Sequence, residues 1–367
     1  MKIRIKFYSI GIYSVLISFL LFSCNNPDDK TKKSEQAHLK IRQQVDTIGF
    51  TQYPWQLDSI FARMDVGDKI STESVYKMAI CPHDDYAYAG GLYAKTLNGI
   101  KAKTIILIGV AHKAQKFNLE NKLVFGSFDV WSGTYGDITI SPLRDKLLKK
   151  MAKESYIVHD SMMQVEHSLE AITPFLQRNN KALEIVPFLV PHSQFHKMEV
   201  FAQELATALA ELMKEENLDY GKDIAIVIST DAIHYGDVDW SSDKMAPFGV
   251  DDKGTARVIE KEHAIIDQCL VGDVSTEKAR LFSETMLEAD DFRVYKWYWC
   301  GRYDVPFGMM FANDLNALIH HKPLSGNLID YRSSLHNKPI ETKDIGMGVT
   351  ADAHQRHWVG YVGVVYK

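Results

Sequence analysis

The apolar positions of this chain form short runs that are separated by longer amphipathic segments. Five runs show little polar alternation, which is typical of strands covered on both faces of a sheet. They span residues 76–81, 104–110, 183–190, 223–229 and 358–365. Helical patterns lie between them, at residues 94–100, 143–153, 168–176 and 200–217. Strands that alternate with helices predict an α/β fold with a mostly parallel or mixed central sheet flanked by helices.

The first 24 residues have the pattern of an export signal. Lys2, Arg4 and Lys6 precede an apolar run over residues 8–22, and Cys24 follows it. A cysteine at this place resembles the lipobox of bacterial lipoproteins, so we expect a lipoprotein signal peptide over residues 1–24 and a lipid on Cys24. This places the chain in the cell envelope, anchored to a bacterial membrane on its periplasmic or outer side. An uncleaved anchor is the alternative, although the run is shorter than the roughly 20 residues of a membrane-spanning helix.

The rest of the chain is predicted to contain one large domain. Residues 25–47 are polar and are expected to be a linker, and residues 48–367 have globular composition. With 46% hydrophobic residues among 367, the chain can bury a sizeable core. The formal net charge of −5 offers no basic excess, so we expect no nucleic-acid partner.

Three cysteines remain if Cys24 carries lipid. They are Cys81, Cys269 and Cys300. A disulfide between Cys81 and Cys269 is compatible with an oxidising compartment. An odd count also indicates a free thiol or one held by a metal.

Polar side chains follow four of the predicted strands. Ligands of open α/β sheets bind beyond the carboxyl ends of the strands, so these side chains are expected to converge at one edge. Imidazoles and carboxylates together suit a first-row metal such as iron, copper or zinc. The residues, strand by strand, are His83 with Asp84 and Asp85, then His112, then His192, then Asp231 with His234.

Two further segments contain residues that could bind metal or take part in catalysis, and each also has a purely structural explanation. Glu166 and His167 stand before Ser168 and Glu170, which could instead open a helix. Cys300 precedes a glycine, which indicates a tight turn, and its thiolate could bind metal or be a buried structural group. Asp231 could likewise be a helix N-cap without a chemical role.

Five short motifs occur in the order seen in one protein family. They are Pro82-His83-x-x-Tyr86-x-Tyr88-x-Gly90, Gly109-x-x-His112, Glu166-His167-Ser168-x-Glu170, Ser229-Thr230-Asp231-x-x-His234-Tyr235 and Cys300-Gly301. Together they resemble the MEMO-like family, called AmmeMemoRadiSam system protein B in prokaryotes. The resemblance extends from about residue 78 to residue 361.

The resemblance implies a fold and a metal site. The family fold is an αβα sandwich similar to class III extradiol ring-cleaving dioxygenases, which hold iron. The implied metal ligands here are His83, His112 and Cys300, with Asp231 and His234 close by as catalytic residues. The implied cofactor is a divalent metal, with iron first and copper or zinc as alternatives.

The same resemblance assigns residues to the cleft around the metal. Glu166 and His167 would line it and take part in catalysis. Tyr86, Tyr88 and Trp131 would contact the substrate, either a small molecule or a peptide. The two carboxylates that follow His83 depart from the family pattern, in which small residues are usual.

Three functions remain open at this point. The first is an iron- or copper-dependent oxidoreductase in which His234 or His167 serves as base. The second is a non-catalytic lipoprotein that binds a peptide or another ligand. The third is a zinc-type hydrolase with Glu166 as base.

Overall fold

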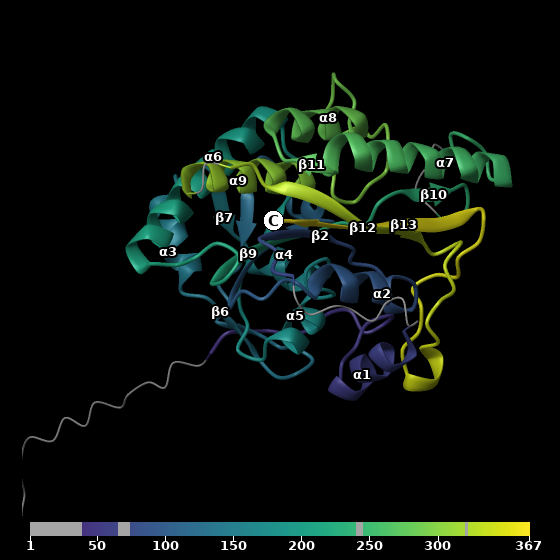
Figure 1. Ribbon diagram of the computed structural model, residues 1–367, viewed down its shortest axis with the longest axis horizontal. Coiled ribbons are helices and arrows are strands. Elements are labelled where there is room, and N and C mark those ends of the chain that lie inside the picture. The colour runs from purple at the N-terminus through teal and green to yellow at the C-terminus, as the bar shows by residue number, and fades with distance from the viewer. Residues whose placement is uncertain (1–38, 65–73, 240–244, 320–321) are drawn as a thin grey trace, which may run out of the picture. The chain divides into compact units, whose positions relative to one another are not determined.

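A mixed sheet with helices on both faces forms the body of the protein (Figure 1). The computed structural model describes residues 39–64, 74–239, 245–319 and 322–367. The strand order along the sheet is β1-β5-β6-β8-β3-β9-β2-β13-β12-β11, with β10 paired to β13, and β4 paired to β7 and β8. The predicted α/β class is confirmed.

The strands are short at the edges and longer in the centre. They are β1 (Ile41–Arg42), β2 (Met78–Cys81), β3 (Thr104–Val110), β4 (Leu123–Phe125), β5 (Val130–Trp131), β6 (Ile138–Ile140), β7 (Tyr156–Val158), β8 (Glu184–Val190), β9 (Ile224–Ser229), β10 (His234–Gly236), β11 (Gly272–Asp273), β12 (Ser325–Ser333) and β13 (His357–Tyr366).

The α-helices are α1 (Pro54–Arg63), α2 (Tyr86–Leu97), α3 (Leu143–Lys150), α4 (Asp160–Val165), α5 (Thr173–Asn179), α6 (Phe195–Glu216), α7 (Asp252–Ile265), α8 (Thr276–Met286) and α9 (Asp304–Ile319). Short turns of other helix types are η2 (Ala114–Phe117), η4 (Ile266–Leu270) and η5 (Lys343–Ile345).

The centre of the sheet is parallel and one side is antiparallel. Strands β6, β8, β3, β9 and β2 pair in parallel in that order. The chain then returns as β13, which runs antiparallel to both β2 and β12. All five predicted strands are present, and the last of them is this antiparallel β13.

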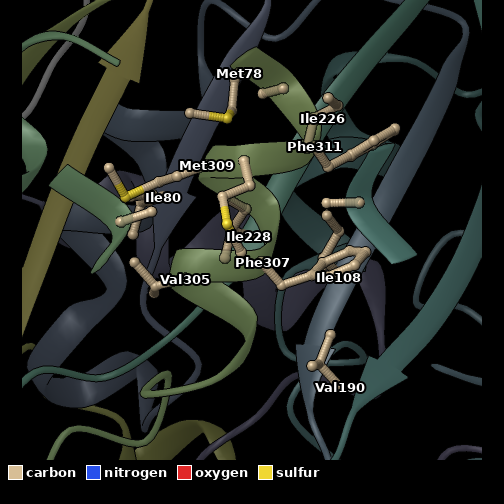
Figure 2. Packing of buried hydrophobic residues seen from close by; sticks show 14 of the residues in the cluster. Met78, Ile80, Ile108, Val190, Ile226, Ile228, Val305, Phe307, Met309 and Phe311 are labelled. Carbon is tan, nitrogen blue, oxygen red and sulfur yellow. The ribbon is translucent and has the colours of Figure 1, made fainter. Parts of the chain in front are cut away.

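Each face of the sheet is covered by its own apolar cluster. Figure 2 shows one of them, where Val305, Phe307, Met309 and Phe311 of α9 lie among side chains of β2, β3, β8 and β9. The side chains of Cys81 and Cys269 belong to different clusters, and both are free thiols. The disulfide considered from the sequence is therefore not formed.

Helix boundaries differ from the prediction where a helix is buried on nearly all sides. Helix α2 begins at Tyr86, eight positions before the predicted start, and ten of its twelve residues are buried. A helix without a polar face shows no amphipathic period, so its first eight residues could not be recognised. Residues 168–172, expected in a helix, form a turn before α5 begins at Thr173.

The C-terminal part of the predicted linker belongs to the domain. Residues 41 and 42 form β1, which pairs in parallel with Val130 and Trp131 of β5. The linker prediction is therefore wrong for residues 39–47. The predicted signal peptide and Cys24 lie outside the described residues. Within the described part of the chain, no helix has the length and apolarity needed to cross a membrane.

Candidate metal centre

Three neighbouring parallel strands end at the same level and deliver His83, His112 and Asp231. Cys81 of β2 pairs with Ser229 of β9, so His83 and Asp231 each stand two positions past a paired residue. Strand β3 is the other neighbour of β9, and His112 follows its end by two positions. The predicted convergence of these residues is confirmed in the structure.

His83 is oriented by a chain of hydrogen bonds that fixes its tautomer. The Ser229 hydroxyl donates to the carbonyl of Ser168 at 2.6 Å, so it accepts from Nδ1–H of His83 at 2.9 Å. The lone pair of His83 Nε2 is left for another partner. Burial, followed by the nearby His112, lowers the pKa of His83 well below its usual value, so the ring is neutral at physiological pH.

Glu166 orients His112. Its carboxylate accepts from the backbone N–H of His112 at 2.8 Å and lies 2.8 Å from Nδ1 of the same ring. It also accepts from the N–H groups of His167 and Ser168, each at 3.0 Å. Burial opposes ionisation, but His112 and the other neighbours lower the pKa of Glu166 to about 2. A carboxylate that holds Nδ1 leaves Nε2 of His112 available to an ion.

His167 lies beside this pair. Its ring stacks on that of His112 with centroids 4.8 Å apart. Burial, followed by His112, lowers the pKa of His167 to about 4, so this imidazole is also neutral at physiological pH.

Cys300 lies in a turn, and His234 is the first residue of β10, where it pairs with Val359 of β13. The Cys300 Sγ lies 3.0 Å from Nε2 of His234. Gly301 follows in the turn before α9, and its N–H donates to Thr230 Oγ1 at 2.8 Å. A Cβ at position 301 would meet this oxygen at 2.3 Å, so glycine allows the loop to approach the end of β9. Burial raises the pKa of the Cys300 thiol and lowers that of His234 to about 3.

A buried glutamate of α7 joins the segments that carry Cys300 and His234. Glu262 accepts from the indole N–H groups of Trp297 at 2.6 Å and Trp299 at 2.9 Å. Its second oxygen accepts from the N–H of Ile233 at 3.1 Å. Trp299 precedes Cys300 and Ile233 precedes His234, so one carboxylate binds a side chain next to Cys300 and the backbone next to His234.

The described residues contain three overlapping groups whose potential ligand atoms lie within 4.8 Å of one another. The groups are His83, His112 and Cys300; His112, Glu166 and His167; and Asp231, His234 and Cys300. The donor set fits a metal in a further respect. Oδ2 of Asp231 faces Nε2 of His83 at 3.2 Å, and both atoms are acceptors when the aspartate is ionised. Burial raises the pKa of Asp231 well above its usual value, so a proton on this aspartate joins the pair when no cation does.

The cluster forms part of the wall of a large cavity. Its volume is about 1180 Å³, and its lining includes His83, His112, His167, Asp231, His234 and Cys300. Tyr88 also lines it, as do Phe50, Tyr295, Tyr298 and Tyr361. A site with a metal-ligating wall and aromatic sides is suited to binding a substrate that is larger than a few atoms.

Several predicted site residues lie elsewhere. Tyr86 is fully buried and donates to the carbonyl of Ala171, and Trp131 is buried beneath Arg42, whose Cζ lies 4.3 Å from the ring centroid. Neither lines the cavity. His192 follows the end of β8 by two positions, and β8 is separated from β9 by β3. Its Nε2 lies 3.2 Å from the hydroxyl of Tyr295. His192 belongs to none of the candidate metal groups among the described residues.

The two unusual carboxylates after His83 line the cavity but already have protein partners. Asp84 accepts from the hydroxyl of Tyr361 at 2.6 Å, and Asp85 accepts from the hydroxyl of Thr350 at 2.8 Å. Burial, followed by Asp84, raises the pKa of Asp85 to about 7. Neither belongs to a candidate metal group in the described part of the chain.

The sequence of this chain is similar to those of a known protein family. Residues 53–349 match the family model of Memo-like proteins. The chain belongs to the Memo-like family. A MEMO1 family protein of Aquifex aeolicus is 30% identical over 53% of this chain and 68% of its own length. Another from Thermococcus kodakarensis is 27% identical over 43% of this chain and 53% of its own length, so the match spans about half of that relative.

Sequence reasoning missed the residues that support the Memo-like site. Ser229 stood within a quoted motif, and its position opposite Cys81 in the register is the signal that could have identified it as a partner of His83. Glu262 carried no such signal, because it lies on a helix with an ordinary amphipathic pattern. His357 also lines the cavity, although no motif of the sequence pointed to it.

Proposed function

We propose that this Memo-like protein is a metal-dependent oxidoreductase of dioxygenase-like ancestry. His83, His112 and Cys300 would hold the ion, with iron as the first candidate and copper or zinc as alternatives. The observation that carries the proposal is the approach of their ligand atoms to within 4.8 Å of one another beside a cavity of about 1180 Å³. Neutral imidazoles and a thiolate suit first-row metals.

A bound iron ion would supply electron transfer between oxygen and an organic substrate. The protein groups around it have separate tasks. His83 and His112 present Nε2 because Ser229 and Glu166 occupy the Nδ1 side. A cysteine must lose its proton to bind a metal, and Nε2 of His234 lies within reach at 3.0 Å from the sulfur, although burial lowers the pKa of His234 to about 3 and makes it a weak base. Asp231 can accept or return a proton beside His83.

The walls of the cavity supply substrate contacts in this proposal. Tyr88 lines the cavity, and its hydroxyl donates to the carbonyl of Ala351 at 3.1 Å. His167 would be a base in this proposal, because its lowered pKa keeps the ring neutral, with a nitrogen lone pair that can accept a proton.

A ligand-binding protein without catalysis is the second candidate, and the size of the cavity favours it. Small-molecule sites usually occupy about 300–1,000 Å³. The cavity here reaches about 1180 Å³, which would admit a peptide segment. The zinc-type hydrolase has less support, because Glu166 already accepts four N–H donors and would have to release some of them to act as base.

Oxygen consumption by reconstituted protein tests the oxidoreductase. The protein is loaded anaerobically with Fe(II), and oxygen uptake is measured with a panel of catechols against His83→Ala and Cys300→Ala. Uptake that requires both residues supports the proposal. Metal binding without uptake for any substrate contradicts it and favours the binding protein. Tight zinc binding with ester or amide hydrolysis would favour the hydrolase.

We also propose that the protein is exported and lipid-anchored through Cys24 in the cell envelope. The proposal rests on the basic, apolar and cysteine-ended pattern of residues 1–24. Labelled palmitate fed to a bacterial host should enter the wild-type protein and not Cys24→Ser. Labelling of neither protein would contradict the anchor.

A further inference from the structure

A buried arginine at the start of the domain touches the loop that supports the metal centre. Arg42 in β1 is only 1% exposed. Its Nε donates to the carbonyl of Met163 at 2.9 Å, and Nη2 donates to the carbonyl of Glu166. Nη1 forms an ion pair with Glu170 at 2.6 Å. The guanidinium therefore contacts three residues of the segment 163–170, and its plane rests on Trp131.

Glu166 connects this arginine to a candidate metal ligand. The backbone carbonyl of Glu166 binds Arg42, while its carboxylate binds both N–H of the His112 backbone and Nδ1 of its ring. One residue thus faces the arginine with its peptide group and His112 with its side chain. A shift of this peptide would move the carboxylate that sets the orientation of the imidazole.

Glu170 ties the same loop to the N-terminal segment. Its carboxylate accepts from the N–H groups of Val45 at 3.1 Å and Asp46 at 2.6 Å, in addition to Arg42. Asp46 lines the cavity, so the segment that begins with β1 reaches the site itself. The segment 41–46 and the loop 163–170 are therefore joined along their length by buried charged groups.

We infer that Arg42 is a positioning residue of the metal centre. It fixes the peptide of Glu166 and thereby holds His112 in the rotamer and tautomer that present Nε2 to the ion. The inference rests on the proposed role of His112 as a metal ligand. It assigns a task in the site to a segment that sequence composition had placed in the linker.

The experiment compares arginine variants at two places. Arg42→Met leaves Glu170 buried without its partner, which is strongly destabilising, so the double variant Arg42→Met with Glu170→Gln removes the charge together with the contact. Arg42→Lys keeps the charge opposite Glu170, but an ammonium cannot make the three forked contacts of a guanidinium. Arg144→Met is the matched control, because Arg144 is also buried and donates to backbone carbonyls, those of Gly126 and Phe128, away from the site.

Two readouts separate positioning from stability. Zn(II) affinity, measured by competition with a chelator, should fall about tenfold in Arg42→Lys and in the double variant, the lower end of the range for outer-shell changes. It should be unchanged in Arg144→Met. The imidazole nitrogen chemical shifts of His112 in metal-free protein should show Nδ1–H in the wild type, and a mixture of tautomers in both Arg42 variants.

A double-mutant cycle with Glu166→Gln tests whether Arg42 acts on metal binding through Glu166. If Arg42 acts through Glu166, then Arg42→Lys should weaken Zn(II) binding no further in the Glu166→Gln background. Unchanged affinity and unchanged His112 shifts in both Arg42 variants would overturn the inference. An equal loss of affinity in Arg144→Met would overturn it as well. If wild-type protein bound no metal, the proposed function would fail, and the nitrogen shifts would still decide whether Arg42 orients His112.

Discussion

The two halves of the candidate metal centre are held in different ways. His83 and His112 stand directly after central parallel strands, and a hydroxyl and a carboxylate bind their Nδ1 atoms. His234 begins the short strand β10 and Cys300 lies in a turn, and Glu262 accepts from the backbone N–H of Ile233 and the indole N–H of Trp299 beside them. The positions of His83 and His112 follow from the register of the parallel strands. The positions of His234 and Cys300 depend on the contacts of Glu262, a buried residue of α7. We therefore expect substitutions behind the first half to change metal affinity, and a substitution behind the second to change stability as well.

Removal of a ligand should have the largest effect. His83→Ala, His112→Ala and Cys300→Ala should each abolish measurable Zn(II) binding, because a cluster with two remaining ligands cannot fill the coordination of a protein site. His192→Ala is the control, since His192 also follows a parallel strand but lies outside the cluster. Titration with Zn(II) against a chelator gives the affinities. Equal losses for His192→Ala and His112→Ala would refute the assignment.

Glu262 should make stability depend on pH. Burial raises its pKa from 4.5 to about 7, and the donors Trp297 and Trp299 only partly offset this. The pKa of Glu262 is higher in the folded protein than in the unfolded chain. Its protonation therefore stabilises the fold fully below pH 4.5, and this contribution is lost as the pH rises through 7. The free energy of unfolding should therefore fall by about 3 kcal/mol relative to Glu262→Gln between pH 4.5 and pH 8.

Urea denaturation at several pH values measures this difference. Glu260→Gln is the matched control, because Glu260 lies exposed on the same helix. It should follow the wild type at every pH. A constant difference between wild type and Glu262→Gln across the range would show that Glu262 does not change its protonation on folding.

Loss of the carboxylate behind His112 should have an intermediate effect. Glu166→Gln replaces one acceptor oxygen by an NH2 group, which cannot accept from N–H groups, so His112 loses part of its support. We expect Zn(II) affinity to fall about 10- to 100-fold. Glu204→Gln serves as control, since Glu204 accepts from the backbone N–H of Ala152 away from the site. An unchanged affinity in Glu166→Gln would assign the orientation of His112 to other contacts.

The smallest expected effect is a difference in the free energy of unfolding between variants of Tyr86 and Tyr88, which stand in the same sequence motif. Tyr86→Phe should lower the free energy of unfolding by about 1 kcal/mol, because its buried hydroxyl donates to Ala171. Tyr88→Phe should change it by less than about 0.5 kcal/mol, because Tyr88 is half-buried at the cavity. Denaturant unfolding measures both. A larger cost for Tyr88 would place that side chain in the core.

The sequence predicted the part of the site that follows from strand order. His83, His112 and Asp231 could be placed because apolar runs predict strands, and parallel strands end at one edge. His192 satisfied the same rule and still lies outside the cluster, because position across the sheet depends on strand order, which periodicity does not contain. Tyr86 and Trp131 were misplaced since a motif does not tell which side chains point into the cavity.

The supporting residues could not be predicted, because their partners are far apart in the chain. Arg42 and Glu170 are separated by 128 positions, and Glu262 and Ile233 by 29. Arg42 lay in a stretch whose polar composition indicated a linker, although it is one of the largest fully buried side chains. A buried charged pair of this kind leaves no periodic pattern in the sequence.

X-ray absorption of the Zn(II)-loaded protein tests the central claim most directly. If His83, His112 and Cys300 share one ion, the spectrum should contain one sulfur neighbour at about 2.3 Å and two imidazole nitrogens at about 2.0–2.1 Å. The sulfur contribution should disappear in Cys300→Ser and remain in His192→Ala. A first shell of nitrogen and oxygen alone in the wild-type protein would contradict the account.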